Sequence, residues 1–264
     1  MGSITDLIAD MRSGVLNIVL EENGQAVGSG TGFLIEQGVV TASHVLRKYP
    51  FDTARLRFAD MDADEGIRLS SDDLLSIVGP ESLKDDCDFA IIQLNEPEFK
   101  NRHRAKLSAP DASIVGEKVV ALGYPFESSH LTAHIGYVSA RYPSGPAMLL
   151  QLDASINPSN SGGPVITTVN ESAVVGIVTR NLTGLAKDFD TLRTALQTNI
   201  EQLRKVAVAR SGSTVRIGGI DPLDATARTF ALMAVLAKNL ERSANVGIGF
   251  AHSSEHIIEA LKNS

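Results

Sequence analysis

Residues 154–166 read ASINPSNSGGPVI, and they decide how the rest of the sequence is interpreted. The serine at position 161 is followed by two glycines and then by a short apolar stretch. Glycines beside a nucleophilic serine let backbone N–H groups converge on one oxygen, because a tight turn has no room for side chains. The segment therefore predicts a turn that carries a nucleophile, followed by a short strand at residues 164–166.

Two further segments supply the partners that a nucleophilic serine needs. Residues 39–45 read VVTASHV and contain His44, and residues 86–92 read DCDFAII and contain Asp88. A neutral imidazole can take the proton of a serine hydroxyl, and a buried carboxylate fixes the tautomer of that imidazole and stabilises its cation. We therefore predict a catalytic triad of His44, Asp88 and Ser161.

The composition is that of a globular protein. The chain has 264 residues, of which 43% are hydrophobic and 21% charged, enough to bury a full core. Its 24 basic and 31 acidic residues give a net charge of −7, and no Lys/Arg cluster is present, so we expect no nucleic-acid partner. The single cysteine, Cys87, cannot close an intrachain disulfide. We interpret it as a small buried hydrophobe, with a redox switch as the alternative.

The sequence gives no signal for a membrane or for export. Asp6 and Asp10 interrupt the apolar residues of the N-terminal stretch, and no basic flank precedes them. This layout differs from a secretory signal, so we predict a cytoplasmic location. The longest nearly unbroken apolar run, residues 230–237, is 8 residues long, whereas a membrane-spanning helix needs about 20.

Short strands dominate the first two thirds of the chain. A helix is expected at residues 4–11, and residues 15–45 alternate β-branched and polar residues with turn signals between them. Further strands are expected at residues 55–58, 89–94, 118–122, 135–140, 148–152, 164–166 and 174–179. Such spacing predicts a β-barrel or sandwich. The polar, proline-bounded stretch 95–110 predicts a linker, with a domain boundary near residue 105.

The periodicity changes after Asp188. Apolar residues then recur every three or four positions, which predicts an amphipathic helix with one apolar face formed by Phe189, Leu192, Leu196, Ile200 and Leu203. A second helix is expected to begin with Asp221 as its N-cap and Pro222 at its first position. Its predicted packing face consists of Phe230, Met233, Leu236 and Leu240.

Six segments in one order resemble the trypsin-like, chymotrypsin-fold serine peptidases, and within them the HtrA/Deg branch. They are GSGTGFLI (28–35), VGEKVVALGYPF (115–126), GYVSA (136–140), ASINPSNSGGPVI (154–166), VVGIVT (174–179) and VGIGFAHSSEHI (246–257). The resemblance implies an all-β core of two six-stranded antiparallel β-barrels with the triad in the cleft between them.

The same resemblance divides the chain into two domains. Residues 1–105 would hold the N-terminal helix and the first barrel, which carries His44 and Asp88. Residues 106–264 would hold the second barrel with Ser161, a helical insertion at about 186–244 and a C-terminal helix at about 253–263.

As a member of this family, the chain would be a serine endopeptidase that hydrolyses protein or peptide substrates through an acyl-enzyme, without metal or organic cofactor. The resemblance places the oxyanion-hole donors at the backbone N–H groups of Ser159 and Ser161. It places the substrate pocket at Ser155, Ile156, Thr179, Arg180 and Asn181. No acid stands at the base of this pocket, so we expect cleavage after small or medium aliphatic residues.

The sequence differs from relatives of this kind at two residues, Ser159 and Asn160, and in its insertion and domain content. Ser159 replaces the family's glycine, and a side chain there lets the peptide turn its N–H away from the hole as an off state. Asn160 replaces the aspartate that digestive-type relatives pair with a freshly cut N-terminus, which implies no such activation. The expected insertion lies between the strands VVGIVT and VGIGFA, and no PDZ-like domain is expected after them.

The insertion at 186–244 has two interpretations. It is a lid or a docking platform for a regulatory protein, or it is a helical hairpin that packs on the barrel or forms a dimer. The alternative to an active enzyme is a catalytically silent or partner-gated binding module that uses this insertion as its main surface.

Metal and nucleotide sites are not expected. Residues 28–32 lack the GxGxxG spacing of a phosphate loop, and Glu65 stands where a calcium loop starting at Asp60 would need glycine. The histidine pair 130/134 falls where a loop runs into a strand, and the pair 252/256 opens the C-terminal helix without an obvious third ligand nearby.

Overall fold

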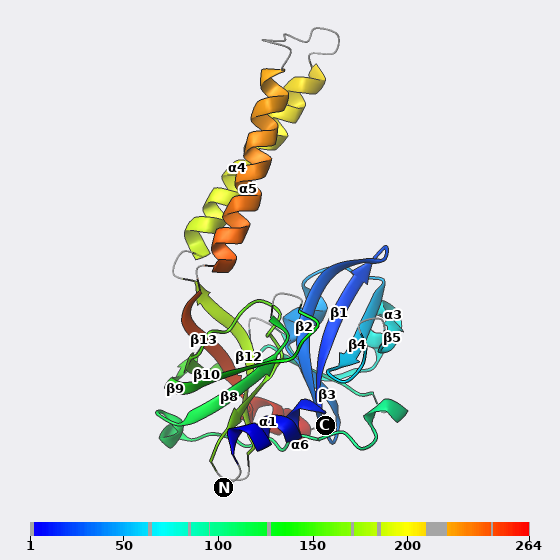
Figure 1. The fold of residues 1–264 in the computed structure, drawn as a ribbon, viewed down its shortest axis with the longest axis vertical. Coiled ribbons are helices and arrows are strands. Elements are labelled where there is room, and N and C mark those ends of the chain that lie inside the picture. The colour runs from blue at the N-terminus through cyan, green and yellow to red at the C-terminus, as the bar shows by residue number, and fades with distance from the viewer. Residues whose placement is uncertain are drawn as a thin grey trace. The chain divides into compact units, whose positions relative to one another are not determined.

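The computed structural model describes residues 3–62, 65–83, 86–94, 96–125, 128–169, 172–183, 186–209, 221–243 and 245–263. The chain divides into two compact units, the first made of residues 1–181 with 247–264 and the second of residues 182–246. The first unit contains two sheets, and the second contains two long helices (Figure 1).

The first sheet has seven strands in the order β5-β4-β1-β2-β3-β7-β6. They are β1 (Val15–Glu22), β2 (Gln25–Ile35), β3 (Gly38–Thr41), β4 (Thr53–Phe58), β5 (Ile67–Ser70), β6 (Val78–Ser82) and β7 (Phe89–Ile92). The predicted turn between β1 and β2 is confirmed, because Asn23 and Gly24 both have positive φ, at 52° and 75°. Two such residues form the turn type that matches the twist of a hairpin.

The number of strands in this sheet differs from the six that we expected. No strand was expected in residues 67–82, which form β5 and β6 on either side of helix α3 (Ser71–Ser76). Both strands lie at an edge of the sheet, where β5 pairs with β4 and β6 pairs with β7. An edge strand is half-solvated, so its sequence need not be strongly apolar, and this hid both strands from the sequence analysis.

The second sheet is the predicted six-stranded barrel, closed in the order β10-β13-β12-β11-β8-β9. Its strands are β8 (Lys118–Gly123), β9 (Thr132–Ser144), β10 (Ala147–Asp153), β11 (Pro164–Thr167), β12 (Val174–Thr183) and β13 (Asn245–Ser253). Every strand predicted from the sequence has a counterpart in one of the two sheets. The all-β core is confirmed, and it consists of this closed barrel and the seven-stranded sheet.

A shared hydrophobic core joins the two sheets and the terminal helices. Helix α1 (Ile4–Arg12) contributes Leu7 and Met11 to this core, and α6 (Glu255–Lys262) contributes Ile257. Phe33 of the first sheet is part of the same cluster. Figure 1 shows α1 and α6 beside each other at the base of the sheets. Two sheets that share a core with both terminal helices form a common scaffold for residues from either half.

The segment between the sheets contains two short 3-10 helices, η1 (Pro97–Phe99) and η2 (Ala112–Ile114). The boundary expected near residue 105 falls between them and stays a prediction, since the two sheets belong to one compact unit.

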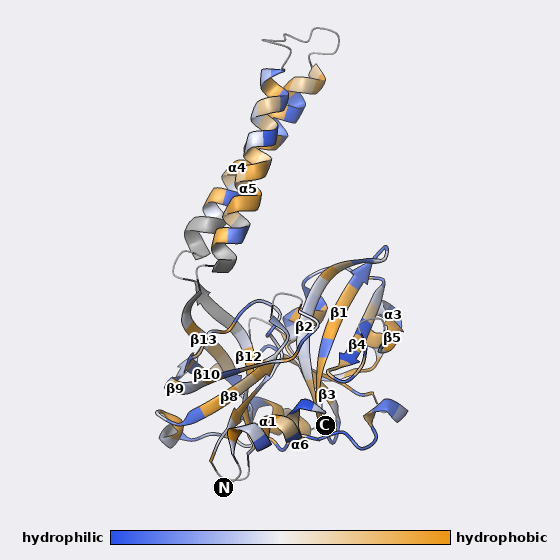
Figure 2. Cartoon of the chain, in the orientation of Figure 1, coloured by the Kyte–Doolittle hydropathy of each residue, from blue (hydrophilic) through white to orange (hydrophobic). Residues whose placement is uncertain are grey.

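The second unit is the predicted helical insertion, formed by α4 (Ala186–Ala209) and α5 (Pro222–Ser243). The N–H of Leu223 donates to Oδ1 of Asp221 at 2.9 Å, which confirms the N-terminal cap of α5. Figure 2 shows hydrophobic residues along both helices. No helix in the described ranges is long and apolar enough to cross a membrane.

The packing face predicted for α5 is wrong in its orientation. Met233, Leu236 and Leu240 were expected to be covered, yet they are 48%, 57% and 50% exposed. Among the side chains described in these two helices, the buried ones are Ala237 of α5 and Leu196 of α4. Residues 230–237 are almost all apolar, so periodicity alone could not tell which side of the helix would face its neighbour.

Candidate active site

His44 and Asp88 form the centre of the candidate site. His44 is the second residue of α2 (Ser43–Arg47), the short helix that follows β3, and Asp88 immediately precedes β7. Nδ1 of His44 lies 2.7 Å from Oδ2 of Asp88, and the backbone N–H of His44 donates to Oδ1 at 3.0 Å. One carboxylate therefore fixes both the backbone and the ring of His44, as the chemistry of a general base requires.

Thr179 of β12 supplies a further hydrogen bond to this carboxylate. Its hydroxyl donates to Oδ2 of Asp88 at 2.7 Å. Burial acts to raise the pKa of Asp88, but the hydrogen bonds and charge of His44 and the hydroxyl of Thr179 outweigh it and hold the pKa below its usual value. Asp88 is therefore a carboxylate at neutral pH, although it is 1% exposed.

Thr179 was expected to line the substrate pocket, and the structure places its hydroxyl on Asp88. A lone threonine in a strand carries no signal of such a role. The threonine also contacts the predicted nucleophile, because Oγ of Ser161 donates to the carbonyl oxygen of Thr179 at 3.1 Å. A serine hydroxyl has one proton to donate, so this proton must leave the Thr179 carbonyl before His44 can accept it.

The loop that carries Ser161 packs closely against the first sheet. Gly162 has φ 88°, and a Cβ there would lie 2.1 Å from the carbonyl oxygen of Thr31. The N–H of Thr31 donates to the carbonyl of Ser161 at 2.8 Å. A side chain at residue 162 would therefore push the loop away from β2, which accounts for the glycine that follows the nucleophile.

Backbone N–H groups of this loop fall into two sets. Those of Asn160, Gly162 and Gly163 donate to carbonyl oxygens within the fold, at 2.8 to 3.1 Å. Those of Ser159 and Ser161 have no acceptor in the described part of the chain. The two donors predicted for an oxyanion hole are therefore not used by the described hydrogen bonds, and the oxyanion hole stays a prediction.

The side chain of Asn160, between these two serines, points to the second barrel. Its Nδ2 lies 3.1 Å from Nε2 of His134 on β9. Burial lowers the pKa of His134, so its ring is neutral near pH 7 and Nε2 can accept from the amide. Asn160 is 1% exposed and therefore anchors the nucleophile loop from inside the fold.

Glu81 of β6 holds the helix that presents His44. Oε1 of Glu81 accepts from the hydroxyl of Ser43 at 2.8 Å and from Nε of Arg47 at 3.1 Å. Nη2 of Arg47 donates to Oε2 at 2.8 Å, which completes a bidentate pair. Sequence reasoning missed Glu81 because the strand that carries it was not expected.

The predicted specificity residues are only partly described. Ser155 is exposed, whereas Ile156 is 1% exposed and belongs to the core of the barrel. Arg180 and Asn181 lie in β12, and their side chains are outside the described residues. The specificity pocket therefore stays a prediction.

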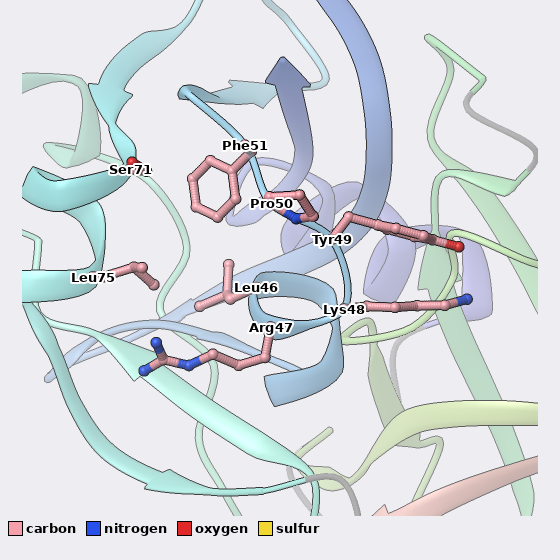
Figure 3. Close-up of a pocket in the computed structure, with 8 residues that line it drawn as sticks. All are labelled: Leu46, Arg47, Lys48, Tyr49, Pro50, Phe51, Ser71 and Leu75. Carbon is pink, nitrogen blue, oxygen red and sulfur yellow. The ribbon is translucent and has the colours of Figure 1, made fainter.

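Figure 3 shows a pocket elsewhere in the first unit, beside α2. It is lined by Leu46, Arg47, Lys48, Tyr49, Pro50, Phe51, Ser71 and Leu75. It contains none of the residues predicted for the site, so it does not serve as the specificity pocket expected from the sequence.

A metal site or a reactive cysteine would be another kind of functional centre in the described part of the chain. Within the described ranges, no group of three or more His, Cys, Asp or Glu side chains is arranged to hold a metal ion. Cys87 is half-buried, and burial raises the pKa of its thiol, which disfavours the reactive thiolate.

Comparisons with known proteins agree with this arrangement. The sequence profile of a family described as "Trypsin-like peptidase domain" matches residues 30–177. "Protease Do-like 5, chloroplastic" of Arabidopsis thaliana is 32% identical over 171 residues, which cover 60% of this chain and 50% of the relative. "Probable periplasmic serine endoprotease DegP-like" of Ectopseudomonas mendocina is 32% identical over 164 residues, which cover 60% of this chain and 30% of the relative.

A solved structure titled "HtrA-type protease AlgW with tripeptide" has the same fold. It superposes with a TM-score of 0.59 at 17% sequence identity, covering 99% of this chain and 63% of that one. This chain therefore spans half or less of the two curated relatives named above and under two thirds of the solved protein.

Proposed function

Since this chain belongs to the trypsin-like peptidase family, we propose that it is a serine endopeptidase with Ser161 as nucleophile, His44 as general base and Asp88 as the group that orients His44. Its relatives in the HtrA/Deg branch carry the names of proteases. The observation that carries the proposal is the buried Asp88 carboxylate, bonded to Nδ1 and to the backbone N–H of His44.

The reaction follows from the groups present. Nε2 of His44 takes the proton of Ser161 as Oγ attacks the scissile carbonyl, and Asp88 stabilises the imidazolium that forms. The N–H groups of Ser159 and Ser161 donate to the oxyanion of the tetrahedral intermediate. His44 then gives its proton to the leaving amine, which leaves an acyl-enzyme on Ser161. Water activated by His44 hydrolyses that ester, with no step that needs a metal or an organic cofactor.

Substrate, partner and location are parts of the same proposal. The substrate is a protein or peptide cleaved after a small or medium aliphatic residue. The hairpin of α4 and α5 is a lid or a docking platform for a regulatory protein. The cytoplasmic location expected from the N-terminus remains open to test, since the matched relatives include chloroplastic and periplasmic proteins.

A fluorophosphonate that reacts with activated serines tests the proposal. The parent chain should be labelled at Ser161, while Ser161→Ala should not be labelled. Ser161→Ala and His44→Ala should each remove nearly all hydrolysis, and the double variant should lose little more, because the two residues act as one unit. A parent chain that is neither labelled nor active would favour a catalytically silent or partner-gated binding module. Additive losses would contradict the triad.

A further inference from the structure

Ser159 has a backbone conformation that a side chain makes costly. Its φ is 73°, in the left-handed region that glycine adopts freely and that other L residues rarely adopt. It lies two residues before the proposed nucleophile, and its N–H is one of the two proposed oxyanion donors. The direction of that N–H depends on the loop keeping this unfavourable conformation, so the surrounding structure must hold it in place.

The hydroxyl of Ser159 contacts a residue from the other half of the fold. Oγ of Ser159 lies 2.7 Å from Oγ of Ser29, which is on β2 of the first sheet. Glycine could not make this contact. The side chain that makes the left-handed conformation costly is therefore also the one that ties residue 159 to a strand of the scaffold.

Thr31, two residues along the same strand, completes the hold. Its hydroxyl donates to the carbonyl of Ser159 at 2.9 Å and accepts from the N–H of Tyr124 at 3.1 Å. Because residues two apart on a strand point to the same face, Ser29 and Thr31 present two hydroxyls to one turn of the loop. One contact holds the side chain of Ser159 and the other holds its carbonyl.

We propose that Ser29 is a positioning residue for the oxyanion hole: its hydroxyl, bonded to that of Ser159, keeps the nucleophile loop in the left-handed conformation that a serine at position 159 would otherwise leave. In this role Ser29 acts through Ser159. The pair acts on the transition state, where the oxyanion needs its donors, and leaves ground-state binding of the substrate unchanged. This inference deepens the proposed function and rests on it.

If Ser29 is a positioning residue, the effect of Ser29→Ala depends on which residue stands at position 159, whereas a general loss of stability would not depend on it. In Ser29→Ala, Ser159 keeps its unfavourable left-handed conformation but loses the hydrogen bond to Ser29 that holds it there. In Ser159→Gly the left-handed conformation is no longer unfavourable and the hydroxyl is absent, so a further Ser29→Ala change removes no hydrogen bond to residue 159. The two positions should therefore be strongly coupled in a double-mutant cycle.

The experiment measures the rate constant of fluorophosphonate labelling, kcat and KM for the parent, S29A, S159G and S29A/S159G. We expect S29A to lower labelling and kcat about tenfold or more in the parent background, with KM changed by less than about twofold. The same change in the S159G background should lower them by less than about twofold. Ser139→Ala is the matched control, since it removes a side-chain hydrogen bond between β9 and β10 and leaves the Ser29–Ser159 pair in place.

Equal losses from S29A in both backgrounds, or no loss in the parent background, overturn the positioning role. Amide hydrogen exchange of a peptide covering residues 156–163 provides a readout that does not depend on activity. S29A should speed this exchange in the parent background alone, and unchanged exchange overturns the inference. Absence of labelling in the parent would count against the proposed function, while the exchange result would still decide the role of Ser29.

Discussion

Thr179 donates its hydroxyl hydrogen bond to Oδ2 of Asp88 at 2.7 Å, and the same oxygen lies 2.7 Å from Nδ1 of His44. The threonine belongs to the closed barrel, whereas the histidine lies in helix α2 after β3 and the aspartate lies just before β7, both next to strands of the first sheet. The carbonyl of Thr179 also accepts from Ser161. One residue of β12 therefore connects the acid and the nucleophile across the two halves of the first unit.

Replacing Thr179 by valine tests this connection. Asp88 loses a donor to a buried charge, so we expect the free energy of unfolding to fall by about 1.5–3 kcal/mol and the pKa of Asp88 to rise. Thr179→Ser keeps the hydroxyl and is the matched control. Urea denaturation at neutral pH measures both variants, and equal stability of the valine and serine variants would show that the hydroxyl contributes nothing.

Cleavage specificity gives the second prediction. A cationic side chain buried in a pocket whose base is Ser155 would have no acid to pair with, at a cost of several kcal/mol. A peptide library digested by the parent chain should therefore be cut mainly after small or medium aliphatic residues. Ser155→Asp should shift the profile toward Lys and Arg. A parent profile dominated by arginine would refute the expected pocket.

The stability of the fold should depend on pH through His134. Burial lowers the pKa of His134 below its usual 6.5, so the unfolded chain binds this proton more readily than the folded one. The contribution of this group to the free energy of unfolding is therefore highest above pH 6.5, and it decreases as the pH falls toward the pKa of His134 in the folded chain. Urea denaturation across this range should show the loss in the parent and a smaller one in His134→Gln. His130→Gln, an exposed neighbour, should retain the behaviour of the parent.

Removal of the helical hairpin tests the proposed role of the insertion. We expect a chain in which a short Gly/Ser loop replaces residues 187–243 to fold, because the hairpin forms a compact unit of its own. Its turnover of a small unstructured peptide should change, since the insertion joins β12 to β13, and β12 carries Thr179. Kinetics equal to those of the parent, on that peptide and on whole proteins, would exclude a gating role.

Local signals were enough to predict much of this protein. The turn around Ser161 and the strands of the closed barrel follow from glycine placement and from apolar periodicity, which act over a few residues. The cap at Asp221 is local in the same sense. The close approach of Gly162 to Thr31 is also visible in the sequence as a glycine, because a Cβ at residue 162 would clash with the carbonyl oxygen of Thr31.

Features that depend on edges or on neighbouring elements were not predictable in this way. The strands β5 and β6 pair at the two edges of their sheet and are only 4 and 5 residues long, too short for their apolar pattern to stand out. The buried side of α5 could not be identified, because its middle is apolar on every side.

The residues with the chemistry of a triad, and most of the strands, can be recognised from the sequence alone. The contacts that orient these residues appear only in the folded chain: Thr179 with Asp88, Glu81 with the helix of His44, and Ser29 with Ser159. Ser29 and Ser159 are 130 positions apart, and their hydroxyls lie side by side because the two sheets pack together. A serine in the sequence does not predict such a contact, because serine is also common in solvent-exposed turns, where its hydroxyl bonds to water or to nearby backbone.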